Sequence, residues 1–123
     1  MIDFEVRILI IDPERKEREN LAKFLKNEKF QVETGKGVTD AIRKISGGKY
    51  DCLIMEVNLP EMKGYEAVSI IKNIDPNIKI IMTTRKNSKR LEAKVREQDI
   101  FFYFIKSFGM DELKLAISNA FRQ

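Results

Sequence analysis

The chain has 123 residues and no histidine, and this absence removes several classes of chemistry. There can be no histidine-based zinc site, no Ser-His-Asp triad and no histidine that donates a phosphoryl group. The single cysteine, Cys52, cannot form an internal disulfide, which fits the cytoplasmic location that we expect for this protein. Because Cys52 lies in an apolar run, we expect it to be buried and inert.

Long apolar runs are also missing from the sequence. The longest uncharged one, Ile100–Ile105, is far shorter than the roughly 20 residues that span a bilayer. The acidic N-terminus lacks the basic and apolar segments of a signal peptide. A net charge of +4 permits acidic partners without requiring nucleic acid. The length suits one domain, residues 1–123, whose core needs no disulfide or metal.

Short apolar runs alternate with stretches in which apolar residues recur at helical spacing. The runs predict strands over residues 6–11, 30–34, 52–57, 78–83 and 100–105, each followed by one helix. Single helices between strands imply right-handed crossovers and a parallel sheet. Five such units predict an α/β, flavodoxin-like (βα)5 fold, a doubly wound parallel sheet with strand order 2-1-3-4-5.

In that strand order, ligands bind beyond the carboxyl ends of the first and third strands. Asp12 follows the first strand and Glu56 ends the third, so the topology predicts two neighbouring carboxylates. Thr83 lies at the end of the fourth strand, while Tyr103 and Lys106 lie on and just after the fifth. Glu56 is the most informative of these residues, because aspartate in this pattern would be typical of a phosphoacceptor.

This ordered set, with the run from Asn58 to Gly64, resembles the receiver domain of bacterial response regulators from residue 6 to residue 121. The resemblance implies that Glu56 occupies the phosphoacceptor position, which is normally aspartate. It also implies that Thr83 and Lys106 correspond to the hydroxyl and the lysine that grip phosphoryl oxygens. Tyr103 corresponds to the aromatic residue that reports the state to partners, and Asn58 to the position whose backbone carbonyl binds Mg²⁺.

Three departures from this pattern affect the expected chemistry. The usual acidic pair is Asp12-Pro13, the acceptor position is Glu56, and the usual Lys-Pro is Lys106-Ser107, which favours a trans peptide. Mg²⁺ needs near-octahedral oxygens, and phosphoryl transfer needs nucleophile, metal and lysine positioned together. We therefore expect the degenerate site of Asp12, Glu56 and Asn58 to have lost Mg²⁺, leaving no cofactor. Glu14 is the one residue that could compensate.

Structural explanations compete with these functional ones. Asp12 could be the N-cap of a helix with Pro13 at its first position, and Thr83 could simply end a strand. Lys106 could be a solvated loop lysine, and Tyr103 could belong to the core. Gly64 could simply serve a turn. If the metal is absent, Lys106 is the main cation near Glu56, and we predict an ion pair between them.

The predicted fourth helix is strongly basic, and Lys86, Arg90 and Lys94 recur at i, i+4 spacing. These residues could form a solvated face or a docking surface, because receivers commonly use helix four, strand five and helix five. We expect a protein partner there, such as a histidine kinase or an output domain. We expect no membrane contact and a monomer or weak homodimer, and the sequence disfavours nucleic acid because no aromatic residues interleave the basic ones.

Three functions remain open at this point. The first, which we favour, is a non-enzymatic receiver in two-component (phosphorelay) signalling that acts by protein–protein contact. Its phosphorylation is impaired or absent, and Glu56 acts as a weak phosphate mimic or as the partner of Lys106. The second is a working phosphoacceptor domain, and the third is a nucleic-acid-binding module that uses the basic helix.

Overall fold

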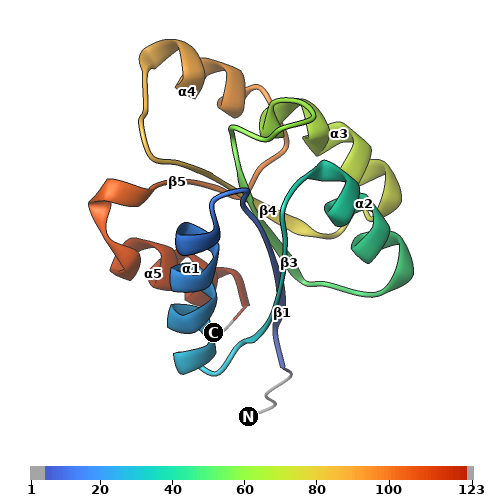
Figure 1. Cartoon of the computed structure of the whole chain (residues 1–123), viewed down its shortest axis with the longest axis vertical. Coiled ribbons are helices and arrows are strands. Elements are labelled where there is room, and N and C mark those ends of the chain that lie inside the picture. Colours follow the sequence, from blue (N-terminus) through green and yellow to red (C-terminus); the bar gives the residue numbers. More distant parts are fainter. Residues whose placement is uncertain (1–4, 122–123) are drawn as a thin grey trace.

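A computed structural model describes residues 5–121, in which five strands and five helices alternate along the chain (Figure 1). All neighbouring strands are parallel, and their order is β2-β1-β3-β4-β5. This arrangement confirms the predicted flavodoxin-like fold. The strands are β1 (Arg7–Ile11), β2 (Gln31–Gly35), β3 (Cys52–Glu56), β4 (Lys79–Thr84) and β5 (Phe102–Ile105).

The helices lie on both faces of the sheet, with α1 and α5 on one face and α2 and α3 on the other (Figure 1). They are α1 (Arg15–Asn27), α2 (Val38–Gly47), α3 (Gly64–Ile74), α4 (Lys89–Arg96) and α5 (Met110–Phe121), and a 3-10 turn, η1 (Lys106–Phe108), follows β5. In the described part of the chain, no helix is long and apolar enough to cross a membrane.

The central strand β3 is buried along its whole length, because helices cover both faces of the sheet. Side chains of successive strand residues point to opposite faces, so they divide between two apolar clusters. Leu9 and Leu53 pack on the side of α2 and α3, and Ile10 and Ile54 pack on the side of α1 and α5. This packing fixes the carboxyl ends of β1, β3 and β4 at one edge of the sheet.

Two predicted helix positions were wrong. Helix α1 begins at Arg15 with Glu14 as its N-cap, so Pro13 lies before the helix. Asp12 instead accepts a hydrogen bond from the Glu14 amide at 2.9 Å, closing a turn rather than capping the helix. Lys86 likewise lies before α4, because the Ser88 hydroxyl caps that helix by accepting from the Leu91 amide at 3.0 Å.

Gly64 is the first residue of α3 rather than a residue of the preceding turn. Its amide donates to the Val57 carbonyl at 2.6 Å. A Cβ at Gly64 would overlap the backbone carbonyl oxygen of Glu56, so only glycine permits this close approach. Gly64 therefore holds the start of α3 directly against the end of β3, where the predicted site begins.

Candidate functional site

A pocket of about 380 Å³ lies at the carboxyl ends of the strands, and the predicted residues Asp12, Glu56, Asn58 and Lys106 line it. Asp12 and Glu56 are buried there, with exposed fractions of 1% and 7%. Since β1 and β3 pair directly, their terminal carboxylates lie side by side, as the topology predicted. The lining residues are Asp12, Pro13, Glu14, Glu17, Glu56, Asn58, Arg85, Lys86 and Lys106.

Lys106 is the central cation of this pocket, and its side chain is only 11% exposed. Its Nζ lies 2.7 Å from Asp12 Oδ2, 2.9 Å from Glu56 Oε1 and 3.2 Å from Glu17 Oε1. The predicted ion pair with Glu56 is therefore present, and Lys106 is not a solvated loop lysine. Burial lowers the pKa of Lys106, but the hydrogen bonds that it donates to Asp12 and Glu56 outweigh burial and raise it.

Glu17 is a pocket residue that the sequence did not predict. It comes from the first turn of α1 and contacts Lys106 and also the guanidinium of Arg85, from the loop after β4. Burial raises the pKa of Glu17, but the charges of Lys106 and Arg85 outweigh it and lower the pKa below its usual value. Glu17 and Arg85 therefore join α1 to the loop after β4 across the pocket. The only available signal was the position of Glu17 five residues after Asp12, near the start of the expected helix.

Both carboxylate oxygens of Glu56 have donors. Oε2 accepts from the Asn58 amide at 3.0 Å, and Oε1 accepts from Lys106 at 2.9 Å. The Thr83 hydroxyl lies 3.4 Å from the same Oε1, which is long for a hydroxyl donor. The Asn58 side chain turns away and accepts from Lys63 Nζ at 2.8 Å. Thr83 is thus at the site, as predicted, with only a weak contact.

The residues present do not fit a divalent cation in this arrangement. Magnesium requires oxygen ligands at about 2.0–2.1 Å in near-octahedral geometry. Pro13 supplies no carboxylate, and the Lys106 ammonium already contacts the carboxylates of Asp12, Glu56 and Glu17. Glu14, the possible substitute ligand, lines the pocket, but within residues 5–121 no group of acids, histidines or cysteines is arranged to hold a metal.

Tyr103 lies on the other side of β5, packed in the cluster beneath α2, α3 and α4, and is 7% exposed. Its hydroxyl donates to Asn87 Oδ1 at 2.7 Å, and Asn87 Nδ2 donates to Glu92 at 3.1 Å. Arg96 donates to Glu92 at 3.0 Å and lies 5.9 Å from the centre of the Tyr103 ring. Burial raises the pKa of Tyr103. Tyr103 is therefore buried, but its polar end is fully engaged with α4 and the preceding loop.

The three predicted basic residues do not all lie on α4. Lys86 lines the pocket, whereas Arg90 and Lys94 are exposed on α4. The predicted triad at i, i+4 spacing is therefore a pair on the helix plus one residue of the loop before it.

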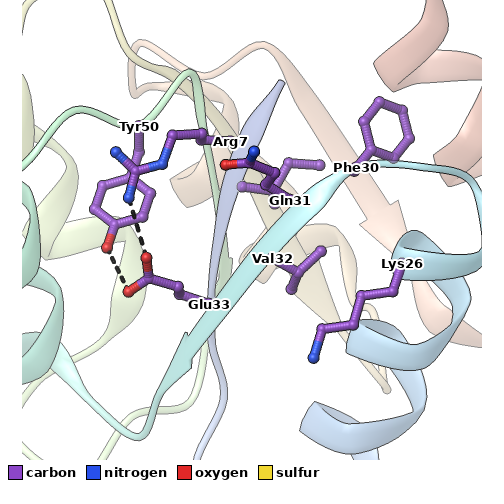
Figure 2. Close-up of a pocket in the computed structure, with 8 residues that line it drawn as sticks. Arg7, Lys26, Phe30, Gln31, Val32, Glu33 and Tyr50 are labelled. Carbon is purple, nitrogen blue, oxygen red and sulfur yellow. Dashed lines mark hydrogen bonds and ion pairs between the residues drawn. The ribbon is translucent and has the colours of Figure 1, made fainter. Parts of the chain in front are cut away.

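A second pocket, of about 310 Å³, lies beside β2 and contains none of the predicted site residues (Figure 2). Glu33 accepts there from Arg7 at 3.0 Å and from the Tyr50 hydroxyl at 2.9 Å. Arg7 also lies over the Tyr50 ring, 4.7 Å from its centre. These paired groups tie β2 to β1 and to the segment before β3, so we assign the cluster a structural role.

The parallel sheet and the acidic pocket at its carboxyl edge are typical of receiver-like signalling domains. Comparison with known proteins identifies the family. The sequence matches the response regulator receiver domain over residues 8–118, so the chain belongs to this family. The transcriptional regulatory protein PcoR of Escherichia coli is 28% identical over 117 residues, covering 95% of this chain and 52% of PcoR. The regulator NtrC of Azospirillum brasilense is 28% identical over 113 residues, covering 92% and 24%.

Solved structures agree with this assignment. The response regulator TrrA of Thermotoga maritima, in complex with Mg²⁺ and beryllofluoride, superimposes with a TM-score of 0.82. It is 31% identical, and the match covers 93% of this chain and 97% of that one. The chain spans about half or less of the length of the two curated relatives named above.

Proposed function

We propose that this chain is a receiver domain that signals from the cytoplasm by protein–protein contact in one conformation, with phosphorylation impaired or absent and no enzymatic role. The observation that carries this proposal is the position of Lys106, whose ammonium contacts the carboxylates of Asp12, Glu56 and Glu17 together. In this arrangement the pocket contains its own cation.

The chemistry of phosphoryl transfer supports this proposal. Transfer to a carboxylate depends on positioning a nucleophile in line with the donor while a metal neutralises the developing charge. Here one oxygen of Glu56 bonds to Asn58 and the other to Lys106. A donor would therefore have to approach an oxygen that already accepts a hydrogen bond, and the oxygen held by Lys106 also lies against its ammonium. The missing second carboxylate at Pro13 also weakens metal binding.

The surroundings of Tyr103 support a single conformation. Moving this side chain outward would break its hydrogen bond to Asn87 and expose a buried ring. A ligand can shift such an equilibrium only by its differential affinity for the two states. If the pocket binds neither Mg²⁺ nor a phosphoryl group, as we propose, no ligand there would supply that difference. The surface formed by α4, β5 and α5 is then constitutively available to a kinase, an output domain or another protein partner.

The experiment is an NMR titration of the labelled domain with Mg²⁺ and beryllofluoride, with the TrrA receiver, whose solved complex contains both, as the positive control. We expect no saturable shifts at the amides of Asp12, Glu56 or Lys106 in the low-millimolar range. Saturable shifts at these amides, together with movement of the Tyr103 ring signals, would contradict the proposal.

A working phosphoacceptor is the second candidate, and one observation favours it. Glu17 brings an additional carboxylate to within 3.2 Å of Lys106, close to the buried Asp12 and Glu56. Intact-mass analysis after incubation with acetyl phosphate and Mg²⁺ distinguishes the two candidates. An unchanged intact mass of the unmodified protein supports the binding module. A phosphoryl adduct on the unmodified protein that is absent from Glu56→Gln supports the phosphoacceptor.

A further inference from the structure

The outer face of α4 carries cations that have no ion-pair partner among the described residues. Lys89, Arg90 and Lys94, which we call the α4 cation strip, are all exposed. Within residues 5–121 none of the three has an ion-pair partner, whereas Arg96, on the same helix, pairs with Glu92 at 3.0 Å. The strip is therefore a concentration of unpaired positive charge within two turns of one helix.

The arrangement of α4 explains why its own acid does not neutralise the strip. Leu91 and Val95 face the core, and Glu92 is drawn to that side by hydrogen bonds from Asn87 and Arg96. At 100° per residue, Lys89, Arg90 and Lys94 fall on the opposite arc of the helix. Ala93, the exposed residue between them, has no long side chain, so a partner could approach the helix closely there.

The strip is also held in a fixed orientation. The Tyr103 hydroxyl ties the loop before α4 to β5 through Asn87, and Arg96 lies against the Tyr103 ring. A surface that is already ordered loses less conformational entropy when it binds. The helix therefore presents its cations without needing a preceding switch.

We infer that the α4 cation strip is the docking site for an acidic segment of a partner protein, whose carboxylates pair with Lys89, Arg90 and Lys94. This inference deepens the proposed function, because it names the chemistry of the partner on the surface proposed there. Charge complementarity would supply specificity and a faster encounter more than raw affinity, since exposed ion pairs are individually weak.

The flanking acids favour a protein segment over a nucleic acid or a membrane. Glu97 and Asp99, both exposed, follow the strip directly, and Glu14 and Glu17 line the pocket beside Lys86. A duplex or an anionic bilayer extends well beyond three cations and would meet these carboxylates. A short acidic segment can pair with the strip alone, and its own basic residue could face Glu97.

The test is an NMR titration of the labelled protein with a short blocked helical peptide that carries glutamates at i, i+4 spacing. A peptide with glutamine in place of every glutamate is the control ligand. The titration is done without Mg²⁺ or a phosphoryl donor, so its result is independent of whether the pocket can be phosphorylated. We expect saturable shifts confined to the amides of residues 86–97, and none with the glutamine peptide.

Two matched variants make the assignment specific. The triple change Lys89→Gln, Arg90→Gln and Lys94→Gln removes three exposed charges from α4, and we expect it to weaken binding about tenfold. The triple change Lys16→Gln, Lys23→Gln and Lys26→Gln removes the same charge from exposed positions of α1 and should leave affinity within about twofold. Unchanged Tyr103 ring signals in both variants show that the fold is intact.

Several outcomes would overturn the inference. Equal loss of affinity in both triple variants would mean that only net charge matters. A random-sequence DNA duplex, or phosphatidylglycerol vesicles, binding the same amides at least as tightly as the peptide would reject a protein partner. Concentration-dependent shifts at the strip without any peptide would instead identify a second copy of this chain as the occupant.

Discussion

Lys106 Nζ lies closer to Asp12, at 2.7 Å, than to Glu56, at 2.9 Å, although its partner in the predicted ion pair was Glu56. The two carboxylates share one ammonium, and Glu17 completes the set from α1 at 3.2 Å. The extra methylene of glutamate extends this carboxylate from the end of β3, where it meets the ammonium. The chain thus supplies a cation that partly neutralises the acids of the pocket.

Replacing Lys106 should convert this pocket into a cation site. In Lys106→Met, the carboxylates of Asp12, Glu56 and Glu17 lose their shared cation, and we expect the free energy of unfolding to fall by about 2–3 kcal/mol. Millimolar Mn²⁺ should recover part of that loss, because the three carboxylates, which are not arranged to hold a metal while Lys106 is present, would then be free to close on a cation. Urea unfolding with and without Mn²⁺ measures both effects.

The control for this prediction is Lys114→Met, which removes an exposed lysine paired with Glu28. That exposed pair should contribute less than about 1 kcal/mol, with no response to Mn²⁺. Equal Mn²⁺ responses in Lys106→Met, Lys114→Met and the unmodified protein would show that Lys106 does not compete with a metal.

Removing the charge of Glu56 should change the environment of the Tyr103 ring. In Glu56→Gln, Lys106 keeps Asp12 and Glu17 but loses one of its three carboxylates, so the turn that follows β5 is held less firmly. We expect shifted Tyr103 ring signals and faster amide exchange over residues 106–108. Glu19→Gln, which removes an exposed carboxylate paired with Arg15, should change neither. An unaltered Tyr103 environment in Glu56→Gln would remove the basis for a locked conformation.

The sequence was sufficient to predict the fold and most of the pocket, because parallel strands bring their carboxyl ends to one edge. Asp12, Glu56 and Lys106 each follow or end a strand, so their convergence depends only on strand order. Glu17 could not be placed in the same way. Its reach depends on where α1 begins, and the predicted start at Pro13 was wrong.

The polar contacts of Tyr103 also could not be predicted from the sequence. Asn87 and Glu92 reach this side chain only because α4 begins after Ser88 and turns Glu92 inward. Periodicity identified the apolar positions of α4, but it could not show which polar residues meet across the helix and β5. Both omissions concern helix starts, which local sequence specifies less sharply than the apolar strands.

Restoring the aspartate chemistry should restore phosphorylation. The double change Pro13→Asp with Glu56→Asp supplies the missing carboxylate and withdraws the acceptor by one methylene from Lys106. We expect an acid-labile phosphoryl adduct after treatment with acetyl phosphate and Mg²⁺, because metal and nucleophile are then positioned together. Intact-mass analysis detects it. Neither single change should be labelled to the same extent, and labelling of Glu56→Asp alone at the full level would show that Pro13 is not limiting.

Breaking the contact between Tyr103 and Asn87 should loosen α4 without disturbing the pocket. In Asn87→Ala the Tyr103 hydroxyl loses its acceptor, and we expect a loss of about 1 kcal/mol in the free energy of unfolding. Hydrogen exchange should accelerate over α4, while the amides of Asp12 and Glu56 stay unchanged. Asn20→Ala, at an exposed position of α1, is the matched control. Unchanged exchange in α4 would show that Asn87 does not hold the helix.

The raised pKa of Lys106 predicts how stability depends on alkaline pH. Burial lowers this pKa, but the hydrogen bonds donated to Asp12 and Glu56 raise it above the ordinary value of 10.5. Because the folded pKa exceeds the unfolded one, the stabilisation is fully present below about pH 10.5 and is lost as pH rises through the folded pKa. The difference in unfolding free energy between the unmodified protein and Lys106→Met should therefore shrink above about pH 10.5. Tyrosine ionisation acts on both proteins and largely cancels in this difference. The corresponding difference for Lys114→Met should stay small throughout, and a Lys106→Met difference that is constant across this range would contradict a charged, carboxylate-bound Lys106.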